Sequence, residues 1–390
     1  MNDPLPVVSV SILTGFLGAG KTTLLNRLLK DPDLADTAVI INEFGDVSID
    51  HLLVEASSDG VIELSDGCLC CTVRGELVDT LADLMDRMQT GRIKPLRRVV
   101  IETTGLADPA PVLQSVLGNP IIAQNFRLDG VVTVVDAVNG LQTIANHVEA
   151  LKQVAVADRL VISKTKLAND AGCDALLQRL RDLNPRAPII DGDTDEAGRA
   201  ELFACGLYDA STKVADVGRW LQDEANADHD HHDHDHGHGH DHHHHHHHHH
   251  HHGHHDHHHH DVTRHGSDIR SFSIVHDRPI EPMALEMFID LLRSAHGEKL
   301  LRMKAVVSVA DNSDRPLVLH GVQSVFHAPE RLTAWPDPDD RRTRMVLITK
   351  GLDEAFVRDL FDAFTGKPRI DRPDAQALAD NPLAVPGLKF

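Results

Sequence analysis

The sequence predicts an α/β domain with a mostly parallel sheet, followed by a smaller α+β domain. Two observations lead to this fold class. Over about the first 218 residues, short β-rich runs alternate with helical segments of ten or more residues, which is typical of a parallel sheet covered by helices. Beyond a histidine-rich tract the expected order changes to β-α-β-β-β-α, which favours a small antiparallel sheet with helices.

Composition limits the class of function. The chain of 390 residues is long enough for two or three domains. It carries 38 Lys and Arg against 59 Asp and Glu, a formal net charge of −21, so we expect no nucleic-acid partner. No apolar run approaches the about 20 residues of a membrane span, and the N-terminal segment lacks the features of a secretory signal. We therefore expect no membrane partner and a cytoplasmic location.

The predicted elements of the first domain, residues 1–218, begin with a strand at 7–13. This continuous apolar run ends at Gly-rich sequence, as expected of a strand buried on both faces. A helix is expected next, at 21–30. The remaining short β-rich runs are 38–42, 97–102, 131–135 and 159–163, and the predicted helices include 76–88 and 174–183.

The turn after the first strand reads Gly-Phe-Leu-Gly-Ala-Gly-Lys-Thr at residues 15–22 and matches the phosphate-binding P-loop motif. In such a loop, backbone N–H groups converge on phosphate oxygens, and the following helix N-terminus favours negative charge. Lys21 would reach the β- and γ-phosphates, and the Thr22 hydroxyl would ligate Mg²⁺. The nucleotide-binding residues predicted from the motif are Gly15, Gly18, Ala19, Gly20, Lys21 and Thr22.

A second nucleotide element follows the strand at 97–102. Glu102, at the end of this buried run, suits a residue that holds Mg²⁺ or its water. Gly105 would let the following backbone N–H approach the γ-phosphate. The predicted catalytic residues are therefore Lys21, Glu102 and Gly105.

The end of the strand at 159–163 stands where P-loop GTPases carry a base-recognition motif. We expect Ser163 and Lys164 to contact the nucleotide, with the stem of Lys164 stacked on the purine. An Asp is expected two residues further on, because its carboxylate accepts two hydrogen bonds from guanine. The chain has Lys166 there, which can only donate. We therefore expect a nucleoside triphosphatase and leave its preference for GTP open.

Three of the five cysteines, Cys68, Cys70 and Cys71, fall within four residues, which is not a disulfide framework. Thiolates suit Zn²⁺, Cu⁺ and Co²⁺. No second cysteine pair is present to complete a structural zinc site, so we predict an open, exchangeable metal site. Glu43 is a candidate oxygen ligand in a segment that would respond to the γ-phosphate. Inert thiols, a redox relay and a solvated surface carboxylate are the alternatives.

Histidine dominates one internal tract. Of 31 histidines, 24 lie between residues 229 and 260, with 5 Asp, 3 Gly and no apolar side chain. Such a segment cannot bury a core, so we predict a disordered His-rich linker over 219–268. Imidazole is a common ligand for Zn²⁺, Ni²⁺ and Cu²⁺. The tract would load several ions, either for delivery or as a passive buffer.

The second predicted domain covers residues 269–366. Its strands are expected at 271–275, 300–309, 315–326 and 342–349, and its helices at 283–294 and 353–364. The last segment, 367–390, is rich in Pro and Asp and is expected to be a loose tail.

Together these motifs resemble the CobW family of metal-linked P-loop GTPases, which is related to HypB and UreG. The resemblance rests on residues 14–29, 41–50, 67–71, 99–109 and 131–137, and continues at 300–307 and 320–323, followed by Trp335. It implies a P-loop GTPase domain, a small α+β CobW C-terminal domain, and GTP, Mg²⁺ and Zn²⁺, or Co²⁺ in some branches, as cofactors.

The resemblance further implies a GTP-dependent metallochaperone that transfers zinc to a client metalloenzyme. Residues Gly15 to Thr23 would then bind nucleotide and Mg²⁺, and the Cys-x-Cys-Cys motif would be the transferable site. A homodimer is left open. Two other functions are also left open: a cobalt chaperone or activator in cobalamin biosynthesis, which rests on the resemblance alone, and a metal storage or buffer protein, which rests on the tract at 229–260.

Overall fold

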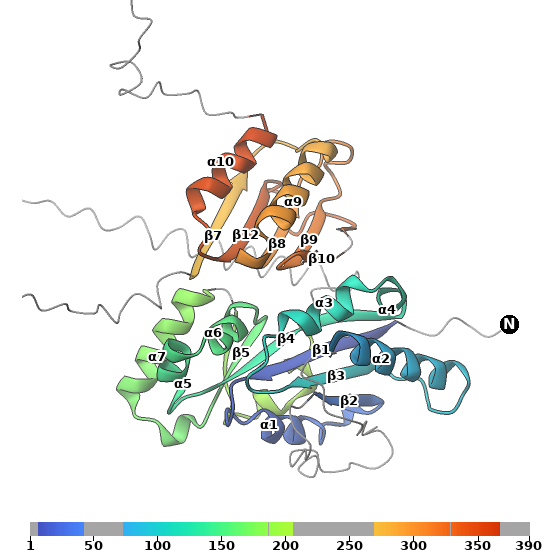
Figure 1. Ribbon diagram of the computed structural model, residues 1–390, viewed down its shortest axis with the longest axis vertical. Helices are drawn as coiled ribbons and strands as arrows, with labels where there is room; N and C mark the ends of the chain where they lie inside the picture. Colours follow the sequence, from blue (N-terminus) through green and yellow to red (C-terminus); the bar gives the residue numbers. More distant parts are fainter. Residues whose placement is uncertain (1–6, 43–72, 186, 206–268, 328, 367–390) are drawn as a thin grey trace, which may run out of the picture.

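The computed structural model describes residues 7–42, 73–185, 187–205, 269–327 and 329–366. Within these ranges the chain forms two domains, each built on one β-sheet (Figure 1). The predicted metal ligands Glu43, Cys68, Cys70 and Cys71 lie outside the described residues, as do the linker at 219–268 and the tail at 367–390. The expectations for these segments remain predictions.

The first sheet has six strands in the order β2-β3-β1-β4-β5-β6, and each neighbouring pair is parallel, which confirms the predicted α/β domain. The strands are β1 (Val8–Gly15), β2 (Thr37–Asn42), β3 (Arg98–Thr103), β4 (Phe126–Asp136), β5 (Arg159–Ser163) and β6 (Ile189–Asp191). The helices of this domain within the described ranges are α1 (Lys21–Leu28), α2 (Val73–Gln89), α3 (Ala110–Gly118), α4 (Pro120–Asn125), α5 (Gly140–Asn146), α6 (Val148–Ala155) and α7 (Asp170–Leu183).

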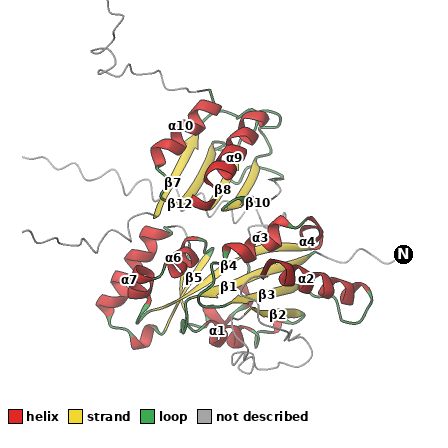
Figure 2. Cartoon of the chain, in the orientation of Figure 1, coloured by secondary structure: helices red, strands yellow, loops and turns green. Residues whose placement is uncertain are grey.

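Helices cover both faces of this sheet (Figure 2), which is why its strands are continuous apolar runs. Alternate residues of β1 point to opposite faces. Ile12 packs in a cluster with Leu81 of α2 and Leu113 of α3. Leu13 packs on the other face, with Leu25 of α1.

The carboxyl ends of the central strands meet at one edge of the first sheet. The pairing registers place Leu13 beside Glu102 and Asp136 beside Ser163. Ligands of open α/β sheets bind outside the carboxyl ends of the strands. Residues predicted from motifs that are far apart in the sequence therefore come together here.

The second sheet is antiparallel, in the order β10-β9-β8-β12-β7, and β11 also pairs with β9. Helices α9 and α10 pack on it through a shared apolar cluster, in which the rings of Phe288 and Phe361 meet edge to face at 5.3 Å. The elements are β7 (Ile269–His276), α9 (Pro282–His296), β8 (Leu300–Val307), β9 (Leu317–Val322), β10 (Val325–Phe326), β11 (Glu330–Arg331), β12 (Thr343–Lys350) and α10 (Glu354–Phe364).

The single strand predicted at 315–326 is wrong. The structure has a hairpin instead, because β9 ends at Val322 and pairs back with β10, which begins at Val325. Gln323 in the turn has a φ of 54°, the left-handed conformation that tight hairpin turns require. Neither turn residue is Gly, Asn or Asp, so the sequence has no residue typical of such a turn.

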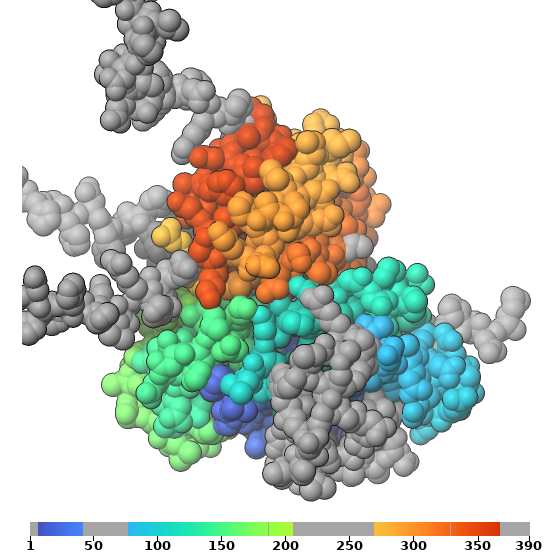
Figure 3. All heavy atoms as spheres, viewed as in Figure 1, coloured from blue at the N-terminus to red at the C-terminus, as the bar shows by residue number. Residues whose placement is uncertain are grey.

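The second sheet lies against the first domain on the side of α3 and α6 (Figure 1), and the atoms of the two domains are in direct contact (Figure 3). Gln114 Nε2 of α3 donates a hydrogen bond to Gln323 Oε1 at 3.1 Å. Arg302 and Lys304 of β8 both contact the carboxylate of Asp158, which lies between α6 and β5. None of the helices in the described ranges is long and apolar enough to span a membrane.

Candidate nucleotide site

Three glycines shape the loop between β1 and α1. Gly15 has a φ of 144°, and a Cβ atom there would lie 2.3 Å from the carbonyl oxygen of Val134. Gly18 and Gly20 have φ values of 71° and 93°, in the left-handed region that favours glycine. The loop ends where α1 begins, at Lys21. The glycines of the predicted motif are therefore those that the backbone path requires.

Lys21 and Thr22 lie at the N-terminus of α1, next to the end of β3. The buried Lys21 donates from Nζ to the carbonyl oxygen of Phe16 at 3.4 Å. Thr22 Oγ1 donates to Glu102 Oε1 at 2.8 Å, and Glu102 is only 4% exposed. The structure thus brings the predicted phosphate-binding lysine, the Mg²⁺ threonine and the acidic residue of the second strand together around one loop.

Gly105 lies in the β3–α3 loop, residues 104–109, directly against the P-loop. A Cβ atom at position 105 would lie 2.4 Å from the backbone nitrogen of Leu17. The adjoining ends of β1 and β3 are joined by a hydrogen bond from Thr103 Oγ1 to Thr14 Oγ1 at 2.7 Å. The loop predicted to approach the γ-phosphate is therefore in contact with the loop predicted to hold the phosphates.

The predicted base-recognition residues also contact the P-loop. Ser163 Oγ donates to the carbonyl oxygen of Ala19 at 2.6 Å. Lys164 Nζ donates to the carbonyl oxygen of Gly18 at 2.8 Å and to Asp136 Oδ2 at 2.7 Å. Lys164 has a φ of 59°, an uncommon conformation for a residue with a side chain. These contacts hold it in that conformation.

Asp136, at the end of β4, is a site residue that the sequence reasoning missed. Partial burial disfavours its charge, but hydrogen bonds from Lys164 and from the Val138 N–H outweigh this effect and lower its pKa. The group is therefore a carboxylate that holds the Lys164 amine against the P-loop. β4 ends at the acidic Asp136, and β3 carries the acidic Glu102 one residue before its end. The reasoning that located Glu102 in the sequence could therefore have located Asp136.

Lys166 is exposed, and a carboxylate from another loop lies beside it. Thr165 Oγ1 donates to Asp193 Oδ2 at 2.9 Å, and the Lys166 N–H donates to the same oxygen at 3.4 Å. The hydrogen bond from Thr165 lowers the pKa of Asp193. The acidic residue expected at 166 is absent from the sequence motif, but Asp193, after β6, is adjacent in space. Asp193 belongs to the segment Asp-Gly-Asp-Thr-Asp at 191–195, and these alternating acidic residues are the sequence signal that could have identified it.

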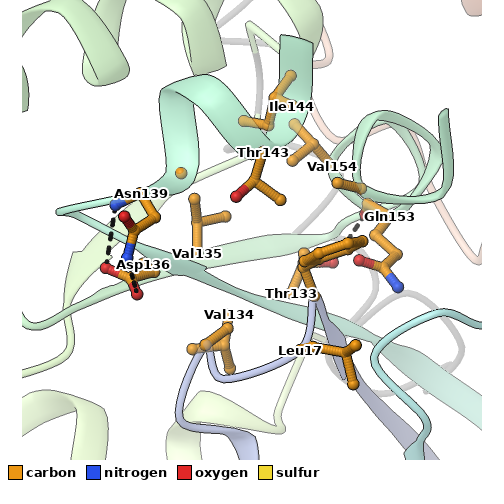
Figure 4. Close-up of a pocket in the computed structure, with 14 residues that line it drawn as sticks. Leu17, Thr133, Val134, Val135, Asp136, Asn139, Thr143, Ile144, Gln153 and Val154 are labelled. Carbon is orange, nitrogen blue, oxygen red and sulfur yellow. Dashed lines mark hydrogen bonds between the residues drawn. The ribbon is translucent and has the colours of Figure 1, made fainter. Parts of the chain in front are cut away.

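A cavity of about 60 Å³ lies beside the P-loop (Figure 4). It is lined by residues that include Leu17 of the loop, Thr133 of β4 and Gln153 of α6. The ring of Phe16, also in the lining, lies 4.5 Å from that of His147. A cavity of this size has room for ordered water.

The described part of the chain contains no group of three or more His, Cys, Asp or Glu side chains that could hold a metal ion. Cys173 and Cys205 are free thiols. Burial raises the pKa of the Cys205 thiol, and a protonated thiol is a poor metal ligand. The predicted metal site at Cys68, Cys70 and Cys71 lies outside the described residues.

Two family models and several known proteins match most of the chain. The model of the CobW/HypB/UreG nucleotide-binding domain matches residues 9–191, and that of the cobalamin synthesis protein cobW C-terminal domain matches residues 269–365. The zinc chaperone YjiA of Escherichia coli is 30% identical over 357 residues, which cover 91% of this chain and 98% of that protein.

A second curated relative is the zinc chaperone CobW of a Sinorhizobium species. It is 30% identical over 383 residues, which cover 90% of this chain and 95% of that protein. The crystal structure of Zn(II)-bound YjiA GTPase from E. coli matches with a TM-score of 0.61 and 26% identity, covering 92% of this chain and 99% of that one. The chain therefore belongs to the CobW/HypB/UreG family.

Proposed function

We propose that this protein is a GTP-dependent metallochaperone, which binds zinc at Cys68, Cys70 and Cys71 and passes it to a client metalloprotein when GTP is hydrolysed. As a P-loop member of its family, the chain is a GTP hydrolase. The observation that carries the proposal is the Thr22–Glu102 pair beside the P-loop, in a chain that also contains three thiols within four residues. Two full-length relatives that are zinc chaperones support it.

The nucleotide would bind along the loop from Gly15 to Thr23, with Lys21 on the phosphates. Thr22 and Glu102 fit a hard divalent cation, because one supplies a hydroxyl oxygen and the other a carboxylate. When bound there, Mg²⁺ would neutralise charge that develops on the phosphates. Glu43 is proposed as a further oxygen ligand. Gly105 would bring the backbone of its loop to the γ-phosphate.

Ser163 and Lys164 would hold the base against the P-loop, since both side chains are anchored to its carbonyl groups. The carboxylate that recognises guanine in other P-loop GTPases would be replaced by that of Asp193, which lies beside Lys166. The zinc ions are the cargo rather than a resident cofactor. Three thiolates would leave the fourth coordination position of the zinc ion without a protein ligand. This open position would permit release of the metal to a client.

The test is a competition titration of Zn²⁺ on a variant that lacks 229–260, so that the tract does not mask the cysteine site. The titration is run without nucleotide, with Mg²⁺ and a non-hydrolysable GTP analogue, and with GDP. We expect the analogue to tighten zinc binding by about 5–150-fold and GDP not to. Cys70→Ser should remove the effect, whereas Cys173→Ser, a matched control, should retain it. Three coincident curves would contradict the proposal.

A zinc buffer is the second candidate, because 24 histidines lie within 229–260. Deletion of this tract should then abolish protection of cells against zinc excess, while Lys21→Ala should not. The metallochaperone function predicts the reverse pattern for client activity in zinc-limited cells: Lys21→Ala lowers it, and the deletion has the smaller effect.

A further inference from the structure

Helix α6 contacts the β3–α3 loop through Gln153 and contacts β8 of the second sheet. It lies on the side of the first domain that faces the second sheet (Figure 1). We propose that α6 couples the nucleotide site to the second domain, with Gln153 as the residue that positions Gly105. This coupling rests on the proposed role of Gly105 at the γ-phosphate. It goes beyond that role by naming the structural connection through which the second domain would respond to the nucleotide.

Gln153 joins α6 to the β3–α3 loop. Its Nε2 donates to the carbonyl oxygens of Gly105 and Ala107, at 3.2 and 3.0 Å. The opposite orientation of the amide would bring its oxygen against both carbonyl oxygens, so the network determines which atom is the donor. The side chain is 1% exposed, and its Oε1 has no hydrogen-bond partner among the described residues. The amide thus anchors two carbonyl groups of the β3–α3 loop to α6.

A second, half-buried contact ties the same two elements together. Lys152 Nζ lies 2.5 Å from Asp108 Oδ2. On its other side the β3–α3 loop touches Leu17 through Gly105, where there is no room for even a methyl group. A displacement of the P-loop or of Gly105 therefore moves the carbonyl groups that Gln153 binds.

The end of α6 is joined to the second domain by buried charge. The carbonyl oxygen of Val156 accepts a hydrogen bond from Arg302, and the Asp158 carboxylate accepts hydrogen bonds from Arg302 and, at 2.7 Å, from Lys304. The Asp158 side chain is only 5% exposed, and its other oxygen accepts from the Val131 N–H at 2.9 Å. Ion pairs removed from water in this way are costly to separate.

Apolar packing reinforces the same junction. Ala155, at the end of α6, packs in one cluster with Leu301 of β8 and Ile348 of β12. Gln153, which contacts the β3–α3 loop, and Val156, which contacts the second domain, are three residues apart. This separation is less than one helical turn. A rigid element this short transmits a shift from one end to the other with little loss.

The test is hydrogen exchange of the full chain, followed by mass spectrometry of peptides that contain β8. The wild type is compared with GDP and with Mg²⁺ plus a non-hydrolysable GTP analogue. We expect exchange in β8 to differ by about fivefold or more between the two states. Gln153→Glu should abolish the difference, because a carboxylate cannot donate to two carbonyl oxygens. Gln114→Glu is the matched control: it disturbs a different contact between the domains and should retain the response.

Lys152→Met is the second variant in case a buried glutamate impairs folding. It removes only the half-buried contact with Asp108, so the β8 response should be reduced rather than lost. The coupling is rejected if the wild type binds both GDP and the analogue with no difference in β8 exchange, or if both variants keep the full response. Zinc titrations that show no nucleotide effect, together with an intact β8 response, would instead reject the metallochaperone function.

Discussion

At the scale of single residues, Gly105 lies so close to Leu17 that no side chain fits between the two loops. A methyl group at position 105 would lie 2.4 Å from the backbone nitrogen of Leu17 and 2.6 Å from its Cα, so one of the two loops must move. We expect Gly105→Ala to lower GTP hydrolysis about tenfold or more and the free energy of unfolding by about 1–3 kcal/mol. Steady-state hydrolysis and urea unfolding measure both effects.

The control for this substitution is Gly118→Ala, in α3. A Cβ atom there would lie 3.7 Å from the nearest atom of Val325, which is ordinary van der Waals contact, and alanine is the better helix former. Its hydrolysis and stability should equal or exceed those of the wild type. A Gly105→Ala variant as active as this control would show that the two loops do not need their close approach.

Lys166 offers a second prediction at the same scale. Lys166→Asp places the acceptor for the N1–H and N2–H₂ groups of guanine at the motif position itself, in addition to the carboxylate of Asp193 from another loop, so the preference for GTP over ATP should rise by about tenfold or more. Lys166→Ala removes the positive charge without adding an acceptor and is the control. Competition between labelled GTP and ATP gives the ratio. Because Asp193 is proposed to supply the carboxylate in the wild type, Asp193→Asn should lower its ratio of GTP to ATP binding. No change in any variant would exclude this loop from base recognition.

At the scale of elements, α7 begins at a side-chain cap. The Asn169 side chain accepts a hydrogen bond from the Gly172 N–H at 2.7 Å, which pairs one of the unpaired donors of the first turn. Asn169→Ala should lower the free energy of unfolding by about 1 kcal/mol, measured as a shift of the urea midpoint. Asn146→Ala, at the exposed end of α5, should change it by less than about 0.5 kcal/mol. Equal effects of the two substitutions would contradict a capping role.

At the scale of the whole molecule, the buried carboxylate of Asp158 in the first domain forms ion pairs with Arg302 and Lys304 of the second. Burial and the neighbouring charge of Arg302 lower the pKa of Lys304 to about 8, although Asp158 opposes the shift. His320 nearby is kept neutral, because burial and then Lys304 lower its pKa. An unfolded lysine has a pKa of about 10.4. Between about pH 8 and 10.4 the unfolded state therefore binds more protons than the folded state, and stability rises with pH.

This linkage predicts a difference between wild type and Lys304→Met. The free energy of unfolding of the wild type should rise relative to that of the variant between about pH 8 and 10. Urea unfolding at several pH values measures the difference, and Lys299→Met, at an exposed lysine, should follow the wild type. Parallel curves for wild type and Lys304→Met would show that Lys304 remains charged in the folded state throughout this range.

The sequence by itself predicted the two fold classes, which the structure confirms, and most residues of the candidate nucleotide site. Continuous apolar runs, alternating with helices, specify a parallel sheet, because only strands covered on both faces can be apolar throughout. The P-loop is identifiable because Gly15, Gly18 and Gly20 occupy backbone conformations that other residues rarely adopt. Glu102, Ser163 and Lys164 could be located because they lie at or directly beside the carboxyl ends of buried strands of that same sheet.

Only the tertiary structure decided which distant side chains complete the site and join the domains. Asp136 and Asp193 lie beside Lys164 and Lys166 because the carboxyl ends of parallel strands meet at one edge. Gln153 looks like an ordinary residue of an amphipathic helix until the fold brings Gly105 to it. The ion pairs of Asp158 with Arg302 and Lys304 depend equally on long-range packing. These contacts join residues up to 146 positions apart, and no local pattern of sequence encodes such a distance.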